Sequence, residues 1–291
     1  MKESAALRSG KGAGDENFPV ASLLIARRHR PAILSFYEFV RVADDIADHP
    51  SLPAEEKLAR LDRLEASLLG SNDDEPQGVH LRNVLAERSL SPVHAQHLLR
   101  AFRQDVTKLR YADWDDLIDY CRYSAMPVGR YVLDVHGESR ATWPANDALC
   151  AALQIINHLQ DCANDFRALN RAYIPEDALR AHGIGVEALA GSHASPALIR
   201  CLQDLARRTA RLLDESRPFA SMLHDTRLAM EVSAIQKLAE RLVATLLVRD
   251  PLSERVHLRK SQMLATGAAG AALGLWRSLF ARKAPSSAFA G

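Results

Sequence analysis

The chain has little of what marks exported, metal-thiolate or nucleic-acid-binding proteins. Its four cysteines are far apart and form no CxxC pair, which excludes a zinc ribbon and a disulfide framework. The first 20 residues contain no apolar core of signal-peptide length, so export is not expected. The 37 basic and 36 acidic residues give a net charge of +1, and nucleic acid is therefore not expected as a partner. Together these absences predict a cytoplasmic protein.

Strand signals are scarce as well. Apolar residues recur at three- and four-residue steps almost everywhere, and β-branched alternating runs bounded by hairpin turns are missing. The segment 171–196 is the one long irregular connection that we expect. The sequence predicts an all-α protein with helices over 19–27, 31–48, 54–70, 79–88, 92–107, 113–136, 145–167, 195–216, 219–248 and 254–280.

A single helical bundle accounts for this pattern. The 291 residues are enough for a sizeable core, and no linker-like change in composition divides the chain into halves. We expect a disordered lead over residues 1–15, an all-α domain over 16–262, and a C-terminal apolar helix and tail over 263–291.

Two acidic motifs lie inside otherwise apolar helices, "DDIAD" at 44–48 and "NHLQDCAND" at 157–165. Acidic residues four positions apart on a helix share one face. A solvated face explains either motif alone, but two such stripes in apolar surroundings favour a shared divalent cation. Mg²⁺ takes a few carboxylate oxygens and completes its shell with water and phosphate oxygens. The sequence therefore predicts a magnesium and diphosphate site with the ligands Asp44, Asp48, Asn157, Asp161 and Asp165.

Another metal chemistry is less consistent with the sequence. Helical bundles also hold di-iron sites, which need repeated Glu-x-x-His motifs. Here only Glu254 and His257 form such a pair. His158 follows Asn157 directly, so on a helix it points about 100° away. We interpret His158 as a packed or surface histidine.

The two motifs resemble those of the squalene/phytoene synthase family, and the segment "YCRYSAMPVG" at 120–129 is similar to the Tyr-Cys segment of that family. The resemblance extends from about residue 16 to residue 260. It implies an all-α isoprenoid synthase bundle with a central apolar cavity, in which two facing Asp-x-x-x-Asp helices hold Mg²⁺ and a prenyl diphosphate.

The N-terminal stretch "ENFPVASLLIARRHRPAILSFYEFVRVADDIAD" is similar to the bacterial members of the hopanoid route. Residues 15–18, "DENF", stand where members that join two prenyl diphosphates usually show a Ser-x-Ser-Phe-like segment, and Gln160 stands where they often carry Arg. Met126 and Asn170 depart from the Asn and Asp expected of the hopanoid subgroup. The resemblance implies that presqualene diphosphate ionises, that its cation rearranges, and that water captures it to give hydroxysqualene without NADPH.

The resemblance also implies residue roles. Arg41, Arg171 and Tyr173 are expected at the diphosphate, and Phe18, Tyr37, Tyr120 and Gln154 along the cavity. With Asn157, these substrate-binding positions complement a catalytic set of Asp44, Asp48, Tyr120, Asp161, Asp165 and Tyr173.

Structural alternatives stay open for several of these residues. Arg41 is also placed to pair with Asp44 or Asp45 on its own helix, and the segment from Arg171 to Pro175 also fits a hinge. Plain core packing is the alternative for Phe18 and Tyr37. The basic cluster Arg255, Arg259 and Lys260 is interpreted as a solvated face.

The segment "MLATGAAGAALGLWRSLFARK", from Met263, is apolar but is interrupted by Arg277 after about 14 residues, whereas a membrane span needs about 20. One interpretation is a final helix packed on the domain or frayed, and Gly270 and Gly274 form a GxxxG pattern in it. The other is an interfacial helix that uses Trp276 and Phe280 at the inner membrane. Peripheral membrane contact would help the enzyme transfer a hydrophobic product to other squalene-pathway enzymes.

Two other functions compete with this prediction. A head-to-head condensing enzyme would join two prenyl diphosphates to presqualene diphosphate, squalene or phytoene, and the segment 15–18 argues against it. A non-catalytic assembly or binding relative of the fold would be expected to lose the aspartates, whereas here both motifs are complete.

Overall fold

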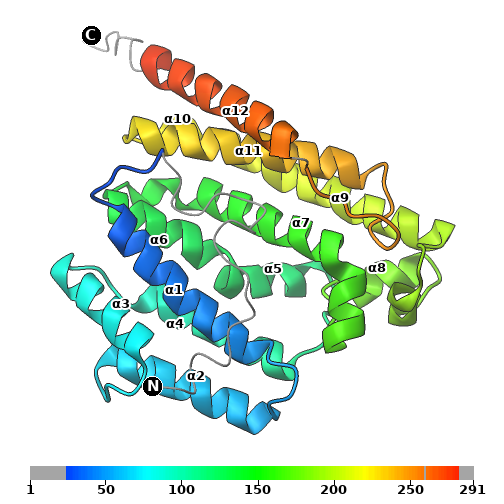
Figure 1. Ribbon diagram of the computed structural model, residues 1–291. Coiled ribbons are helices and arrows are strands. Elements are labelled where there is room, and N and C mark those ends of the chain that lie inside the picture. Colours follow the sequence, from blue (N-terminus) through cyan, green and yellow to red (C-terminus); the bar gives the residue numbers. More distant parts are fainter. Residues whose placement is uncertain (1–23, 259, 282–291) are drawn as a thin grey trace, which may run out of the picture.

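The computed structural model describes residues 24–258 and 260–281, with the side chains of Lys260 and of 276–281 left out. The described residues form helices and no β-strand, which confirms the all-α prediction (Figure 1). The α-helices are α1 (Arg30–Ala47), α2 (Ala54–Leu69), α3 (Pro76–Glu87), α4 (Val93–Thr107), α5 (Trp114–Ser124), α6 (Met126–His136), α7 (Trp143–Leu169), α8 (Glu176–Ala181), α9 (Pro196–Ser216), α10 (Phe219–Met222), α11 (Thr226–Leu246) and α12 (Lys260–Ala281).

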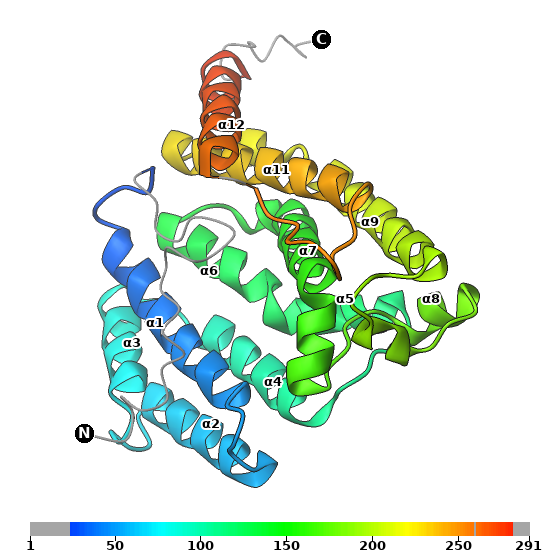
Figure 2. The same ribbon diagram turned by 45° about the vertical axis from the view of Figure 1, so that its right-hand side comes forward.

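Two apolar clusters hold the bundle together. One lies among α1 to α4, and the other joins α5 and α7 to α9 and α11. Helix α6 contributes to both, because Tyr131 and Val135 pack on the first cluster and Leu133 packs on the second. Tyr131 stacks on Phe36 of α1 with ring centroids 3.9 Å apart. In Figure 2, α7 lies between α1 on one side and α9 and α11 on the other.

The two helices that carry the acidic motifs end near the predicted positions. Pro31 occupies the first turn of α1, where its missing N–H costs no hydrogen bond. Asp48 is the C-cap of α1. Helix α7 ends at Leu169, and its C-cap is Asn170, whose φ of 51° lies in the left-handed region. Asparagine adopts this conformation more readily than most residues, which gives the departure noted at position 170 a local structural reason.

Three of the predicted helices are wrong in extent. The predicted helix over 113–136 is broken at Ala125 into α5 and α6, because Pro127 cannot continue an α-helix from α5. The predicted helix over 219–248 is broken after Met222, and α11 starts afresh where Asp225 accepts hydrogen bonds from the N–H groups of Arg227 and Leu228. Residues 254–258 are not helical, so the last helix begins at Lys260.

The N-terminal helix expected over 19–27 and the long connection expected over 171–196 also differ from the prediction in part. Of the predicted helix over 19–27, residues 24–27 are not helical and residues 19–23 lie outside the described residues. The long connection over 171–196 is largely irregular as expected, but it contains α8 and a 3₁₀ turn at Val186–Ala190.

Helix α12 packs directly along α11. A Cβ atom added at Gly270 would lie 2.6 Å from the Cα of Ala234, and one at Gly274 would lie 2.9 Å from the Cα of Met230. The GxxxG pattern therefore forms a close helix contact within the fold. Among the described residues, no helix is both long and apolar enough to cross a membrane. The expected boundary at residue 262 falls inside α12, and the three-part division of the chain stays a prediction.

Candidate active site

The two acidic motifs meet at one cavity. Asp44 and Asp48 come from the C-terminal end of α1, and Asn157, Asp161 and Asp165 come from the C-terminal half of α7. All five side chains line a cavity of about 410 Å³. The structure therefore brings together the five residues predicted as metal ligands. Their role as ligands stays a prediction.

The carboxylates of this cavity are costly to keep charged. Loss of hydration and repulsion from Asp48 raise the pKa of Asp44 to about 7. Loss of hydration and repulsion from Asp161 raise the pKa of Asp165 to about 7 as well. Both groups favour a nearby positive charge, which would relieve the repulsion in each motif.

The donor set would suit hard divalent cations. Within the described residues, no three carboxylates of the two motifs converge to within 4.8 Å of one another. A single cation enclosed by protein carboxylates alone does not match this spacing. Cations that each take one or two carboxylates and fill their shells with water and phosphate oxygens do match it, and this is the usual coordination of Mg²⁺.

Arg41 lies between the two motifs. Its guanidinium donates to Asp44 Oδ2 at 2.9 Å and to Asp45 Oδ1 at 2.6 Å, so the intrahelical pairing considered for it is present. Arg41 also lines the cavity beside Asn157 and Asp161. Its position is therefore compatible with both roles, and its contact with diphosphate stays a prediction.

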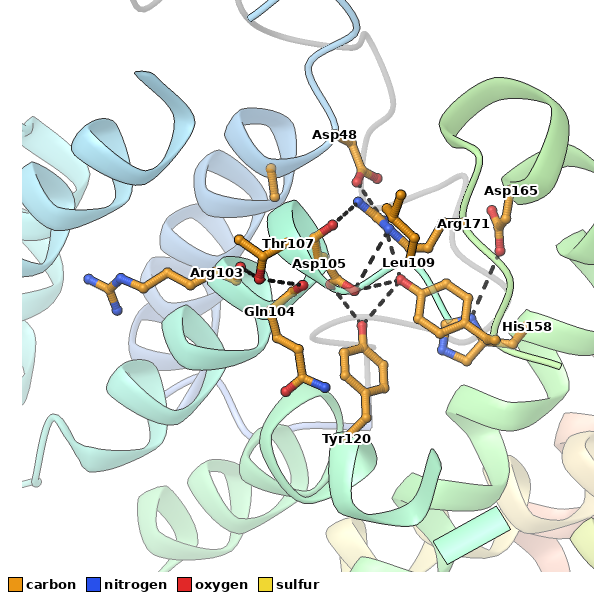
Figure 3. A network of polar contacts seen from close by, with 12 residues as sticks. Asp48, Arg103, Gln104, Asp105, Thr107, Leu109, Tyr120, His158, Asp165 and Arg171 are labelled. Carbon is orange, nitrogen blue, oxygen red and sulfur yellow. Dashed lines mark hydrogen bonds and ion pairs between the residues drawn. The ribbon is translucent and has the colours of Figure 1, made fainter. Parts of the chain in front are cut away.

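Arg171 joins the second motif to the first (Figure 3). It is only 5% exposed, and its Nη1 donates to Asp48 Oδ1 at 2.9 Å and to the Tyr173 hydroxyl at 3.2 Å. Nη2 donates to the backbone carbonyl of Asp105 at 2.9 Å. The segment that follows α7 is thus fixed against α1 and α4 by a buried cation whose side chain lines the cavity.

Asp105 is the site residue that the sequence analysis missed. The hydroxyls of Tyr120 and Tyr173 each donate to one of its carboxylate oxygens at 2.8 Å. Loss of hydration raises the pKa of Asp105 to about 6, against the opposing effect of Arg171 and of the two hydroxyls. The available signal was a lone acidic residue one turn after buried Ala101 on the apolar face of α4. A single such residue is too common to identify a site.

His158 and Gln154 form a polar pair one turn apart on α7. Gln154 Nε2 lies 3.1 Å from His158 Nε2, and the His158 ring stacks on Tyr173 with centroids 3.5 Å apart. Burial, together with the charge of Arg171, lowers the pKa of His158 to about 3. The interpretation of His158 as a packed histidine is confirmed, but its side chain also lines the cavity.

The remaining predicted residues divide between the cavity and the undescribed part of the chain. Tyr37, Tyr120 and Gln154 line the cavity, together with the apolar side chains of Val40, Phe102 and Val128. Tyr37 is half-buried there, so core packing alone does not describe it. Phe18 lies outside the described residues.

A second hollow of about 760 Å³ shares Arg41, Asn157, Asp161 and Asp165 with the first. The segment 251–257 forms its other wall, and Arg255 and His257 lie in that segment. The interpretation of Arg255 as part of a solvated face is therefore incomplete: its side chain is exposed, but it lines a hollow shared with the second acidic motif. Arg259 and the side chain of Lys260 lie outside the described residues.

A separate group of potential metal ligands, His29, His136 and Asp225, lies at the other end of α1. Burial and repulsion from His136, Arg28 and Arg88 lower the pKa of His29 to about 4. Arg28 Nε also donates to His29 Nε2 at 2.9 Å. These positive charges oppose a bound cation, so we assign no metal to this group.

An all-α bundle with two acidic helices lining one cavity defines the class of isoprenoid synthases that process prenyl diphosphates. The chain belongs to the squalene/phytoene synthase family, whose model matches residues 12–262. It is 61% identical over 259 residues to a hydroxysqualene synthase of Rhodopseudomonas palustris, covering 89% of both chains. It is 52% identical over 282 residues to that of Sinorhizobium fredii, covering 97% of both.

Solved structures agree with this assignment. The crystal structure of the squalene synthase HpnC from Alicyclobacillus acidocaldarius superposes with a TM-score of 0.70 at 33% identity, covering 84% of this chain and 91% of that one. A dehydrosqualene synthase in complex with a ligand matches with a TM-score of 0.75 at 19% identity, covering 94% and 96%. The latter likeness concerns the fold alone.

Proposed function

We propose that this enzyme converts presqualene diphosphate and water to hydroxysqualene and diphosphate, in the hopanoid route of triterpene synthesis. The observation that carries the proposal is that both acidic motifs line one cavity, which they share with the apolar side chains of Val40, Phe102 and Val128. Identity favours this reaction over condensation, since relatives named hydroxysqualene synthase match at 51–61% and phytoene synthases at 28–33%.

Mg²⁺ is the proposed cofactor, and Asp44, Asp48, Asn157, Asp161 and Asp165 are the proposed ligands. The raised pKa values of Asp44 and Asp165 support a cation here, because these carboxylates have lost hydration and repel their acidic neighbours. When bound, Mg²⁺ supplies Lewis-acid neutralisation of the charge that develops on the departing diphosphate.

Arg41, Arg171, Tyr173 and Arg255 are the proposed diphosphate contacts. Arg171 is held by three hydrogen bonds, so it needs no reorganisation as negative charge develops. Arg41 and Arg255 line the hollow beside the second motif, where a departing diphosphate would remain. In this arrangement the protein stabilises the leaving group from the end of α1, from the end of α7 and from the segment 251–257.

The hydrocarbon is proposed to lie against the apolar wall. Val40, Phe102 and Val128 offer apolar contacts to the hydrocarbon, and the rings of Tyr37 and Tyr120 offer π-faces to the carbocation. Tyr120 donates a hydrogen bond to Asp105, so its hydroxyl oxygen stays fixed while the substrate rearranges.

The proposal is tested by product analysis of purified protein with Mg²⁺ and without NADPH. One incubation receives presqualene diphosphate and the other farnesyl diphosphate, and the products are identified by mass spectrometry. Hydroxysqualene from presqualene diphosphate is the expected result. Release of presqualene diphosphate or a coupled hydrocarbon from farnesyl diphosphate would place the chain among the condensing enzymes.

Peripheral membrane contact is a second part of the proposal, for an enzyme that works in the cytoplasm at the inner membrane and hands its product to other squalene-pathway enzymes. The outward face of α12 supports it, since the exposed residues Leu264, Ala268, Ala272 and Leu275 follow one another at three- and four-residue steps. Leu264 is 75% exposed.

Flotation with anionic phospholipid vesicles tests this contact. We expect the wild-type protein to float and Leu264→Glu to remain at the bottom of the gradient. Val248→Glu is the control, because Val248 is 79% exposed but follows the end of α11 and is not part of α12. Equal behaviour of the wild type and Leu264→Glu would contradict contact through this face.

A further inference from the structure

The buried imidazole of His158 has no part in binding metal or diphosphate as described above. It stacks on Tyr173 with an interplanar angle of 17°, and its Nδ1 faces Asp165 Oδ2 at 4.0 Å. These two neighbours hold the ring at the wall of the cavity, and Figure 3 shows its contact with Asp165. Because the ring is held in place, it also restricts the orientation of a side chain that hydrogen-bonds to it.

The group that His158 restricts is the carboxamide of Gln154. An amide nitrogen can only donate, so the 3.1 Å contact between Gln154 Nε2 and His158 Nε2 makes the ring nitrogen the acceptor. The orientation of the carboxamide is thereby set, with its oxygen turned away from the ring. Among the described residues no donor bonds this oxygen, although Gln154 lines the cavity.

We infer that the Gln154 carboxamide oxygen binds the water that captures the carbocation, and that His158 is the positioning residue that aims this oxygen. A water that donates a hydrogen bond to Gln154 Oε1 has a lone pair directed away from Gln154, toward the apolar space where the cation lies. The inference rests on the proposed function, because it concerns the water-capture step of that reaction.

The step balances without a further reagent. The C–O bond of presqualene diphosphate breaks and its electron pair leaves with diphosphate. After rearrangement, a lone pair of the bound water forms the new C–O bond. The proton that the water then loses passes to the departed diphosphate, the strongest base in the cavity, because the amide oxygen is too weak a base to keep it.

The same geometry explains how one water molecule can bind beside the apolar side chains of the cavity. Val40, Phe102 and Val128 offer no hydrogen bonds, so a water beside them is unfavourable. An oriented acceptor on α7 creates a favourable place for a water beside them. Without that acceptor, the cation is quenched by proton loss, and the products are thirty-carbon hydrocarbons.

The test compares product ratios from presqualene diphosphate, Mg²⁺ and no NADPH. His158→Met removes the ring acceptor at similar volume, whereas His158→Gln keeps an oxygen acceptor near the position of Nε2. Gln154→Met removes the proposed water acceptor itself. His94→Met is the matched control, because His94 is a buried histidine that bonds Asp134 and does not line the cavity.

We expect the alcohol-to-hydrocarbon ratio to fall by about tenfold in His158→Met and in Gln154→Met, the effect of one lost hydrogen bond on the capture step. His158→Gln should recover most of the alcohol, and His94→Met should keep the wild-type ratio. An unchanged ratio in both Met variants would overturn the inference. So would a loss of diphosphate release in proportion to the alcohol, which would place both residues in the ionisation step. A wild-type protein that makes no hydroxysqualene would instead overturn the proposed function.

Discussion

Arg171 donates a 2.9 Å hydrogen bond from Nη1 to Asp48 Oδ1, joining residues that are 123 positions apart in the chain. Asp48 ends the helix of the first acidic motif, and Arg171 directly follows the helix of the second. The contact therefore fixes the distance between the two motifs from outside either helix. A buried arginine with several donors suits this task, because one planar group bonds a carboxylate, a hydroxyl and a carbonyl at once.

Asp161→Asn tests the proposed metal shell. The substitution keeps the size of the side chain but removes its charge and replaces one acceptor oxygen by an NH₂ group, so we expect turnover to fall about 100-fold or more while the fold is retained. Turnover of presqualene diphosphate and far-UV circular dichroism measure the two effects. Asp62→Asn is the control, because Asp62 is a surface carboxylate paired with Arg103 and its side chain is 67% exposed. If Asp161→Asn kept most of its turnover, Asp161 would be removed from the metal shell.

Magnesium should stabilise the protein more strongly at pH 8 than at pH 6. The pKa values of Asp44 and Asp165 are about 7 in the folded protein, whereas unfolded carboxyls titrate near pH 4. Between pH 4 and 7 the folded state binds more protons, so these two groups lower the free energy of unfolding as the pH rises. A cation binds the deprotonated form, and its apparent affinity therefore falls below pH 7.

Thermal unfolding with and without Mg²⁺ at both pH values measures this effect. Asp44→Asn should reduce the difference between the two pH values, since it removes one of the two titrating ligands. An increase in Tm that is the same at pH 6 and pH 8 would contradict the assignment of these carboxylates as ligands.

Tyr173→Phe should lower the free energy of unfolding by about 1.5–3 kcal/mol, the usual contribution of a buried hydrogen bond to a charged group. The change removes a 2.8 Å bond to Asp105 and an acceptor for Arg171. Tyr120→Phe removes the other bond to Asp105. Urea denaturation of the single and double variants should show coupling of about 0.5 kcal/mol or more. Additive effects would mean that the two hydroxyls do not act through one carboxylate.

Gly270→Val should separate α12 from α11, because a Cβ at this position would lie 2.6 Å from backbone atoms of α11. We expect the cost of overpacking, about 1–3 kcal/mol, and faster proteolysis within α12. Gly267→Val is the matched control, since no atom lies within 4 Å of a Cβ added there. Limited proteolysis and thermal unfolding compare the two variants. Equal effects would indicate that helix propensity, rather than the contact with α11, controls the result.

Local patterns predicted the parts of the fold that depend on local interactions. The helices of the two acidic motifs were predicted within two residues of their observed ends, because their apolar faces follow helical periodicity without interruption. The breaks at Ala125 and before Asp225 were missed, since apolar periodicity continues across them. Pro127 and the capping aspartate at 225 override that pattern locally.

The candidate site was predictable only as far as its motifs extend. Spacing placed Asp44 with Asp48 and Asp161 with Asp165, and the resemblance placed the two helices face to face. Asp105 was not found, because its partners Tyr120 and Tyr173 are 15 and 68 residues away in the chain. The position of Arg255 beside the second motif likewise depends on the irregular path of 251–257, which no periodicity encodes.

The most direct test of the account follows the oxygen of water. Purified protein, presqualene diphosphate and Mg²⁺ are incubated in ¹⁸O-labelled water without NADPH, and both products are analysed by mass spectrometry. Ionisation at the carbon–oxygen bond predicts hydroxysqualene that carries one ¹⁸O and diphosphate that carries none. Labelled diphosphate with an unlabelled alcohol would show hydrolysis at phosphorus and would contradict the account.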